Sequence, residues 1–338
     1  MYDDLFVLLS CEHPTLPLAE FESCLRGSGT KYHLKPSPFG TLRYYGPVDE
    51  SISAIKRCAL SRCLHLELSY GNSLEELLDN LQVKGISPAE NEGFKVNVTS
   101  IKAPYNVTKP LSHVIRVLER ELNLKLDWKS SRNVFHLIFS ENSLLLGYEL
   151  SPSARSEVLK RGSKYRPFKR PSTLPSTLAR CMVNLSLLKE NETLLDPFCG
   201  VGGILLESCS LGINSIGGDL DYSLLKLAKN NLCFFGFNAE LYHGDARFIP
   251  FHNLHGIVSD PPYGRLSSTH GIKLMDIYKG FIYSASLSLR ENGMCVFLSP
   301  SMLGVEEICE KLGFLNEGLY TIYVHSALTR VIHVCRRV

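Results

Sequence analysis

The sequence lacks the features of an extracellular or membrane-embedded protein. Its 11 cysteines form no Cys-x-x-Cys pair, and the two closest in sequence, Cys58 and Cys63, have no second pair at the distance of a zinc finger. An odd number of scattered thiols fits a reduced protein better than a disulfide framework. The apolar run at residues 5–9 is too short for a signal peptide, and no apolar run is long enough to span a bilayer. We therefore expect a cytoplasmic protein that is not inserted in a membrane.

An excess of either charge is also missing, because 36 basic residues stand against 34 acidic ones. A nearly neutral surface does not attract a polyanion as a whole, so an anionic partner must meet a local basic patch. Residues 155–170 hold such a patch, with seven basic residues and the single acid Glu157. We expect Arg166, Lys169 and Arg170 in it to contact substrate phosphates. A solvated, flexible tether is the alternative for this segment.

Residues 1–150 lack glycine-rich turns between their strand-like and helix-like runs, which is typical of small α+β modules. The elements predicted for a first module, 1–55, are strands at 5–10 and 42–45, a helix at 18–26, and a helix that Asp49 caps and that runs through Leu60. The elements predicted for a second module, 56–150, are strands at 65–69, 94–98, 134–139 and 143–150, and helices at 73–81 and 111–122.

Serine, proline, glycine and basic residues dominate from residue 151, and we predict a basic linker over 151–172. Strands and helices alternate regularly in the last region, 173–338. The predicted strands are 193–196, 215–219, 240–243, 256–259 and 294–298, with helices at 204–211 and 222–235 among those between them. This rhythm indicates a parallel sheet covered on both faces. Two final runs, 319–324 and 329–334, predict an antiparallel hairpin.

The first strand of this sheet ends at Asp196 and is followed by a turn that contains Phe198, Gly200 and Gly202. Glycines let a bulky ligand approach the backbone at such a turn, although a tight structural turn is the alternative. Leu205 stands where a dinucleotide fingerprint has its third glycine, which disfavours NAD. The carboxylate of Asp196 also suits a cationic ammonium group better than a pyrophosphate.

Two further strands of the predicted sheet also lead to acidic residues. Asp219 follows Gly200 at the spacing expected of an acid that binds ribose hydroxyls. Asp221 is expected to cap the next helix rather than to bind a ligand. The pair Asp245 and Ala246 follows the third strand and suits an adenine amino group, although Asp245 alone would be an ordinary turn residue.

The fourth strand ends in the motif Asp260-Pro261-Pro262-Tyr263-Gly264. Two prolines make a stiff turn with carbonyl acceptors. Acceptors on Asp260 and Pro261 could hold both hydrogens of an exocyclic amine, and Tyr263 could stack on the base. An Asp-Pro turn alone is common, but this one lies at the edge of the sheet where α/β proteins bind their ligands.

These motifs, with the stretch Arg166-Pro167-Phe168-Lys169-Arg170-Pro171, resemble Rossmann-type amino methyltransferases, and specifically the archaeal tRNA guanine-N2 methyltransferases acting at position 10. The resemblance implies S-adenosylmethionine as cofactor, tRNA as partner, and an RNA-binding THUMP domain beside an N-terminal ferredoxin-like domain. It implies that Asp196, Phe198, Gly200, Gly202, Asp219, Asp245 and Ala246 bind the cofactor and that Asp260, Pro261, Pro262 and Tyr263 form the catalytic motif. Some relatives bind a small zinc-containing activator protein. Val201 departs from the family, where threonine or serine is expected.

Three other functions remain open at the level of sequence. The same acceptors suit an N6-adenine or a ribosomal guanine-N2 methyltransferase, and a non-catalytic RNA-binding protein could keep the fold. A separate DNA-recognition domain does not fit into the short stretch after Tyr263, so no DNA partner is expected. No metal-ligand cluster stands out among the 11 histidines. We predict no metal site, and we expect His65, His136 and His333, which lie in strand-like runs, to be structural.

Overall fold

The computed structural model describes residues 1–83, 85–86, 88–89, 92–102, 108–129, 132–170, 173–263, 273–326 and 328–338. The chain divides into two compact units, each built on one seven-stranded mixed sheet. Unit 1 comprises residues 1–12, 28–56 and 61–153, and unit 2 comprises residues 13–27, 57–60 and 154–338. The protein is therefore an α/β protein with two mixed sheets.

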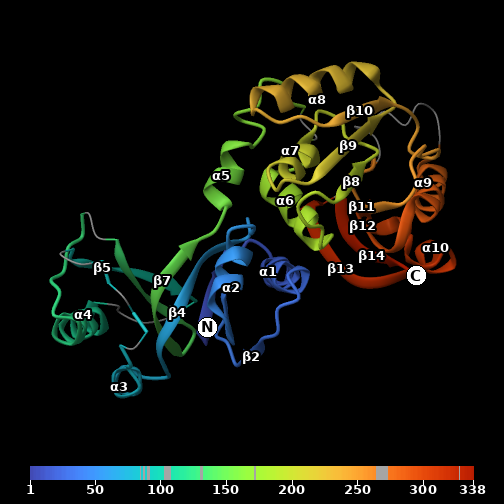
Figure 1. Cartoon of the computed structure of the whole chain (residues 1–338). Helices are drawn as coiled ribbons and strands as arrows, with labels where there is room; N and C mark the ends of the chain where they lie inside the picture. The colour runs from blue at the N-terminus through green and yellow to red at the C-terminus, as the bar shows by residue number, and fades with distance from the viewer. Residues whose placement is uncertain are drawn as a thin grey trace. The chain divides into compact units, whose positions relative to one another are not determined.

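The sheet of unit 1 has the strand order β2-β3-β1-β4-β7-β6-β5. Figure 1 labels β2, β4, β7 and β5 of this sheet. The bounds are β1 Tyr2–Leu9, β2 His33–Lys35, β3 Thr41–Pro47, β4 Ser61–Gly71, β5 Phe94–Ile101, β6 Asn133–Ser140 and β7 Ser143–Pro152. All neighbours are antiparallel except β5 and β6. Because β1 pairs with both β3 and β4, strands from the predicted modules 1–55 and 56–150 form one continuous sheet.

The helices of unit 1 are α2 Val48–Ile55, α3 Leu74–Asp79 and α4 Thr108–Leu122. Ser73 caps α3 by accepting a hydrogen bond from the Glu76 amide at 3.1 Å. The helix predicted from Asp49 through Leu60 is wrong at both ends, because Pro47 is at the N-cap and α2 ends at Ile55. Leu60 belongs to unit 2, and its amide donates to the Glu20 carboxylate of that unit instead of to a helical carbonyl.

The sheet of unit 2 has the order β10-β9-β8-β11-β12-β14-β13. The bounds are β8 Thr193–Asp196, β9 Asn214–Asp219, β10 Glu240–His243, β11 Leu254–Ser259, β12 Leu289–Pro300, β13 Phe314–His325 and β14 Leu328–Arg337. The first five strands of this order are parallel, and β14 runs antiparallel to β12 and β13. The predicted parallel sheet and its C-terminal hairpin are therefore confirmed. The chain reverses its direction of winding between β8 and β11, where such sheets bind ligands.

The helices of unit 2 are α1 Leu16–Gly27, α5 Arg155–Lys160, α6 Ser176–Leu185, α7 Gly203–Cys209, α8 Tyr222–Phe234, α9 Leu274–Ser288 and α10 Glu306–Lys311, with the short 3₁₀ helix η1 Ser301–Leu303. The structure assigns α1 to unit 2, although the sequence predicts it within the module 1–55. Its fully buried Glu20 accepts hydrogen bonds from the Leu60 amide at 2.7 Å and from Asn184 of α6 at 2.9 Å. These bonds satisfy a carboxylate that would otherwise be costly to bury.

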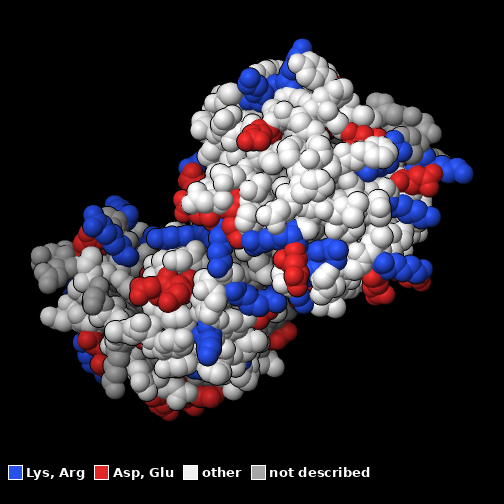
Figure 2. All heavy atoms as spheres, turned by 45° about the vertical axis from the view of Figure 1, so that its right-hand side comes forward, with Lys and Arg blue, Asp and Glu red and all other residues white. Residues whose placement is uncertain are grey.

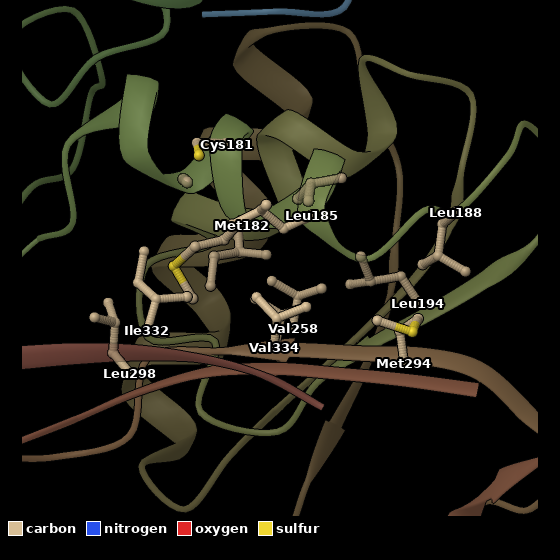
Figure 3. Packing of buried hydrophobic residues seen from close by; sticks show 14 of the residues in the cluster. Cys181, Met182, Leu185, Leu188, Leu194, Val258, Met294, Leu298, Ile332 and Val334 are labelled. Atoms are coloured by element: carbon tan, nitrogen blue, oxygen red, sulfur yellow. The ribbon is translucent and has the colours of Figure 1, made fainter. Parts of the chain in front are cut away.

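Helices cover both faces of the unit 2 sheet, and the strand alternation shows how. Leu194 packs with Met182 of α6 on one face, and its neighbour Leu195 packs with Phe281 of α9 on the other. Figure 3 shows the first of these clusters, in which Met182 lies close to Ile332 of β14. Each fully buried side chain of this kind stabilises the fold by about 1.5–3 kcal/mol. A strand that is buried on both faces, such as β8, consists mainly of apolar residues. This pattern made it possible to predict β8 from the sequence.

The segment predicted as a linker, 151–172, is largely structured where it is described. It begins with the end of β7 and continues into α5, and residues 171–172 lie outside the described part. A wholly flexible tether is therefore wrong for this segment. Among the described residues, no helix has both the length and the apolar composition that a membrane crossing requires.

Candidate functional site

The turn after β8 adopts the backbone conformation for which its glycines were singled out. Gly200 has φ 52° and Gly202 has φ 84°, both in the left-handed region that other residues rarely adopt. Gly202 is also the N-cap of α7. A Cβ at Gly200 would meet nothing within 4 Å among the described atoms, so the turn leaves open space on that side. The turn can thus approach a ligand with its backbone.

Asp196 lies at the tip of β8 and is only 1% exposed. Its Oδ1 accepts hydrogen bonds from Ser259 Oγ at 2.5 Å and from the Phe198 amide at 3.2 Å. Burial raises the pKa of Asp196 to about 7, the two hydrogen bonds lower it, and the charge of Asp219 raises it further. A buried carboxyl with so high a pKa is prepared to take up a cation, which would stabilise its charged form.

Asp219 ends β9 and is bonded to the glycine turn. Its Oδ2 accepts from the Gly200 amide at 2.9 Å, and its Oδ1 accepts from the Asp221 amide at 2.9 Å. Burial raises the pKa of Asp219, while these amides and the charge of Arg170 lower it. Asp221 caps α8 by accepting from the Ser223 amide, as predicted. Asp219 therefore fixes the turn that precedes α7 and lies beside it as the prediction requires.

Asp245 follows β10, but its carboxylate is already paired. Arg247 Nη2 donates to Asp245 Oδ2 at 2.6 Å, and Arg247 Nε reaches Oδ1 at 3.1 Å. The Arg247 side chain accordingly lowers the pKa of Asp245. The side chain of Ala246 is buried in the core beside α9, so only its backbone can face a ligand. A ligand amine at Asp245 would have to share the carboxylate with Arg247.

Asp260 lies directly after β11 and forms an ion pair with Arg330 of β14. The guanidinium of Arg330 also lies 4.3 Å from the centre of the Tyr263 ring. Arg330 is 7% exposed, and burial lowers its pKa to about 10. The pair Pro261 and Pro262 joins the two residues that Arg330 contacts, so one arginine holds both ends of the motif. Gly264, the last residue of the predicted motif, lies outside the described residues.

Sequence reasoning missed two residues of this site. Arg330 is separated from Asp260 by 70 residues, and no local pattern links them. Tyr242 of β10 lies against Gly218 of β9, where a Cβ would be 2.4 Å from its ring. The buried Tyr242 hydroxyl has no hydrogen-bond partner in the described part of the chain, and burial and the charge of Asp196 raise its pKa. The Gly217-Gly218 pair at the end of β9 is the one sequence signal that could have indicated a large side chain opposite.

A buried cluster of charges lies behind the glycine turn. Glu207 of α7 is fully buried and binds Arg161 through two hydrogen bonds at 3.0 and 2.8 Å and Arg180 at 3.0 Å. Arg166 is 4% exposed, and its Nη1 and Nη2 have no partner among the described residues. Arg166 lies next to Gly203, since a Cβ there would be 3.2 Å from its Nη1. The structure buries Arg166 beneath the turn, which contradicts a role in binding external phosphates.

The other two predicted substrate residues, Lys169 and Arg170, are exposed. Their segment is tied to the turn, because Asn231 of α8 binds both carbonyls of Phe168 and Val201 at 2.9 Å. The exposed rings of Tyr165 and Phe168 precede these basic residues in the same segment. Elsewhere Figure 2 shows basic and acidic side chains intermixed, as the small net charge predicts. Lys169 and Arg170 therefore remain candidates for phosphate contacts near the turn.

The doubly wound sheet, the glycine turn and the Asp-Pro-Pro-Tyr motif at one edge define a class, the Rossmann-type S-adenosylmethionine-dependent amino methyltransferases. The family model of the RMKL-like methyltransferase domain matches residues 163–330. The chain is 30% identical to the tRNA (guanine(10)-N2)-dimethyltransferase of Methanothermobacter thermautotrophicus, over 99% of this chain and 100% of that protein. It is 27% identical to the protein of the same description from Pyrococcus abyssi, over 84% and 86% of the two chains. The chain belongs to the tRNA (guanine(10)-N2)-dimethyltransferase family.

Two solved structures extend the likeness in fold to almost the full length. The crystal structure of TrmN from Thermus thermophilus matches with a TM-score of 0.57 at 20% identity, over 99% of this chain and 100% of that one. The structure of SMU.472, a putative methyltransferase complexed with SAH, matches with a TM-score of 0.57 at 14% identity, over 98% and 97%. Both units of the chain are therefore found together in known proteins.

Proposed function

We propose that this protein transfers a methyl group from S-adenosylmethionine to the exocyclic N2 of guanosine at position 10 of tRNA. The products are N2-methylguanosine and N2,N2-dimethylguanosine. The observation that carries this function is the ion pair of Asp260 with Arg330, which holds an amine-binding motif at the carboxyl edge of the sheet. The full-length similarity to family members supports the choice of tRNA guanine over adenine or ribosomal RNA.

The residues at the turn fit the cofactor, which supplies an electrophilic methyl group when bound. Asp196 offers a buried carboxylate to the ammonium group, and the two unpaired nitrogens of Arg166 suit the methionine carboxylate. Asp219 is the proposed partner of the ribose hydroxyls. The Tyr242 hydroxyl, which has no hydrogen-bond partner among the described residues, is close enough to Asp196 for that carboxylate to raise its pKa. The adenine remains assigned to Asp245 and the backbone of Ala246. Phe198, Gly200 and Gly202 shape the turn that is proposed to hold the cofactor.

The motif Asp260-Pro261-Pro262-Tyr263 can hold the guanine amine in the orientation that methyl transfer requires. Arg330 binds Oδ1 of Asp260, so the amine of guanine is expected at Oδ2 and at the Pro261 carbonyl. Accepting both hydrogens from fixed positions orients the nitrogen lone pair toward the methyl donor. Asp260 can take the surplus proton afterwards. Because the target amine lies inside a helix, the base must be extruded, and Tyr263, backed by Arg330, offers a stacking surface for it.

We assign RNA binding to unit 1 together with Lys169 and Arg170. The ferredoxin-like module over 1–55 and the THUMP domain over 56–150 are the proposed divisions of unit 1, with α1 contributing to unit 2. The methyltransferase domain is proposed over 173–338. The names of the relatives support tRNA and give no support for an activator protein, so tRNA is the one macromolecular partner proposed. A reducing, cytoplasmic location is part of this proposal, and all 11 cysteines are free.

The test is incubation of the protein with unmodified tRNA and labelled S-adenosylmethionine, followed by digestion to nucleosides. We expect label in N2-methylguanosine and N2,N2-dimethylguanosine, and none when guanosine at position 10 is replaced by adenosine. Label in N6-methyladenosine would overturn the proposal. An inactive protein that binds tRNA but not S-adenosylhomocysteine would favour the non-catalytic alternative.

The variant Asp260→Ala tests the catalytic motif. This variant should bind S-adenosylhomocysteine and tRNA as the wild type does, because Asp260 contacts neither Asp196 nor the glycine turn in the described structure. Methylation should fall by a factor of about 10² or more, since a fixed acceptor of the reacting amine is lost. Full activity of Asp260→Ala would refute the assignment of this motif.

A further inference from the structure

Four side chains of the kinds that bind metals meet inside unit 1, far in sequence from the methyl-transfer motifs. They are Cys63 and His65 of β4, His136 of β6 and Glu149 of β7. One ligand atom from each lies within 4.8 Å of the other three. Cys63, His65 and His136 are buried, and Glu149 is 24% exposed at its side chain. We call these four residues the Cys-His-His-Glu cluster.

The register of the sheet builds this cluster. Cys63 and His65 are two residues apart on β4 and therefore point to the same face. Glu149 of β7 is paired with His65, and His136 of β6 is paired with Gly147. Gly147 has no side chain, and a Cβ there would be 2.8 Å from the Cβ of His65. The Phe6 ring would be nearer still, at 2.3 Å, so the glycine makes room for the stacked rings of Phe6 and His65. The ring centres of His65 and His136 are 4.5 Å apart.

The histidines of the cluster have nitrogens without protein partners. Neither Nδ1 nor Nε2 of His65 makes a hydrogen bond of ordinary geometry with the described residues, although His65 is 0% exposed. The nearby backbone of Phe6 only partly offsets the burial that lowers the pKa of His65. Nδ1 of His136 also has no partner, while its Nε2 lies 2.9 Å from Glu149 Oε2. Among the described residues, the backbone of Phe6 is the one hydrogen-bond partner near the His65 ring. Buried polar atoms are rarely left with so little hydrogen bonding, so these histidine nitrogens indicate a ligand.

We propose that the Cys-His-His-Glu cluster binds one zinc ion with four protein ligands. A thiolate, two imidazoles and a carboxylate are the donors that Zn²⁺ accepts in tetrahedral sites, and the mixture disfavours magnesium and calcium, which take oxygen ligands. Ligand atoms around zinc lie about 3.3–3.8 Å apart, so the cluster needs only small side-chain movements to close on the ion. The ion would replace the contact between His136 and Glu149 and supply a partner for one ring nitrogen of His65.

The charges in the cluster agree with a divalent cation. Zinc binds imidazole in its neutral form and cysteine as the thiolate. A thiolate and a carboxylate together carry two negative charges, which one zinc ion would balance.

The proposed site is structural, because four protein ligands leave no open position for a substrate. It joins β4 to the consecutive strands β6 and β7, which follow much later in the chain. The apolar residues Phe6, Leu8, Ile138 and Leu145 pack with Cys63 in the same core cluster and keep water from the site. Zinc would therefore stabilise unit 1 without taking part in methyl transfer.

The test is metal analysis of the full-length protein, produced with added zinc and dialysed without chelator. We expect about one zinc per chain in the wild type and a background amount in Cys63→Ala and in His136→Ala. The matched control is Cys295→Ala, which removes a buried strand cysteine of unit 2 and should keep the zinc. Metal-free wild type, or zinc retained in both cluster variants, would overturn the proposal.

A second measurement uses only the wild type, in case the variants do not fold. Replacing zinc with cobalt should produce the intense absorption of a four-coordinate Co²⁺ ion together with a thiolate-to-cobalt charge-transfer band. Removal of the metal should lower the melting temperature, and added zinc should restore it. A folded protein that takes up cobalt without either spectral feature, or whose melting temperature ignores zinc, would refute the site.

Discussion

Replacing Asp196 with asparagine should make the protein more stable and at the same time unable to hold its cofactor. The amide oxygen of asparagine can still accept the hydrogen bonds that Ser259 and the Phe198 amide donate to Asp196 Oδ1. Only the ionisable group is lost. The substitution therefore isolates the free energy of a buried negative charge from the packing around it.

The magnitude follows from the pKa of Asp196, which burial raises from 3.8 to about 7. Between these two pH values the folded protein keeps a proton on Asp196 that the unfolded chain has released. The contribution of Asp196 to wild-type stability is therefore greatest below pH 3.8, falls as the pH rises toward 7, and is constant above it. One pKa unit corresponds to about 1.4 kcal/mol, so the charged carboxylate costs about 4 kcal/mol at neutral pH and above. The Asp196→Asn variant has no carboxylate here, so its free energy of unfolding should not include this unfavourable contribution.

The assay is the free energy of unfolding of both proteins, measured by denaturant titration at several values between about pH 5 and pH 8. The difference between the two proteins should grow with pH and level off near pH 7, since all other titrating groups are common to both. Calorimetry at the same pH values should show that Asp196→Asn loses affinity for S-adenosylhomocysteine. A stability difference that does not change with pH would refute the raised pKa, and unchanged affinity would refute the ammonium contact.

Three other substitutions test separate parts of the site. Arg330→Met removes the cation that contacts both Asp260 and Tyr263. It should lower the rate of single-turnover methylation by about 10²-fold and leave the affinity for S-adenosylhomocysteine unchanged. An unchanged methylation rate would contradict this prediction. Gly202→Ala should cost about 1–2 kcal/mol of stability and weaken cofactor binding measured by calorimetry, because its φ is 84°. Gly236→Ala, at φ 74° and with no atom within 4 Å of its Cβ, is the matched control that should strain the backbone alone. Replacing both Lys169 and Arg170 with alanine should weaken tRNA binding and reduce the slope of log affinity against log salt by about two. An unchanged slope in filter-binding titrations would exclude phosphate contacts.

The sequence predicts most of unit 2 because its information there is local. Apolar residues mark β8 and β11 as buried strands. The acids Asp196 and Asp219 end β8 and β9, and Asp260 directly follows β11. The carboxyl ends of parallel strands meet at one edge, so knowing the strands is enough to bring the acids together. Glycines with positive φ are equally local, and Gly200 and Gly202 behave as predicted.

What could not be predicted depends on contacts between distant segments. Arg330 is an ordinary residue of a strand until the order β11-β12-β14 brings it beside Asp260. The burial of Arg166 also follows from packing, since a basic segment shows no sign of which arginine turns inward. Cys63 and His65 do show the alternation of a strand, but His136 and Glu149 join them only through the register of three strands.

Because α1 belongs to unit 2, it affects how the chain folds during synthesis and which fragments of it can fold. Residues 16–27 leave the ribosome well before α6, against which α1 packs, so this early segment must wait for a later one before it can fold. Until then Leu16 and Ala19, which end in the core of unit 2, have no partners there. A fragment that starts at residue 151 would lack Glu20 and leave Asn184 without its acceptor. We expect such a fragment to aggregate, and a fragment supplemented with the α1 peptide to recover solubility.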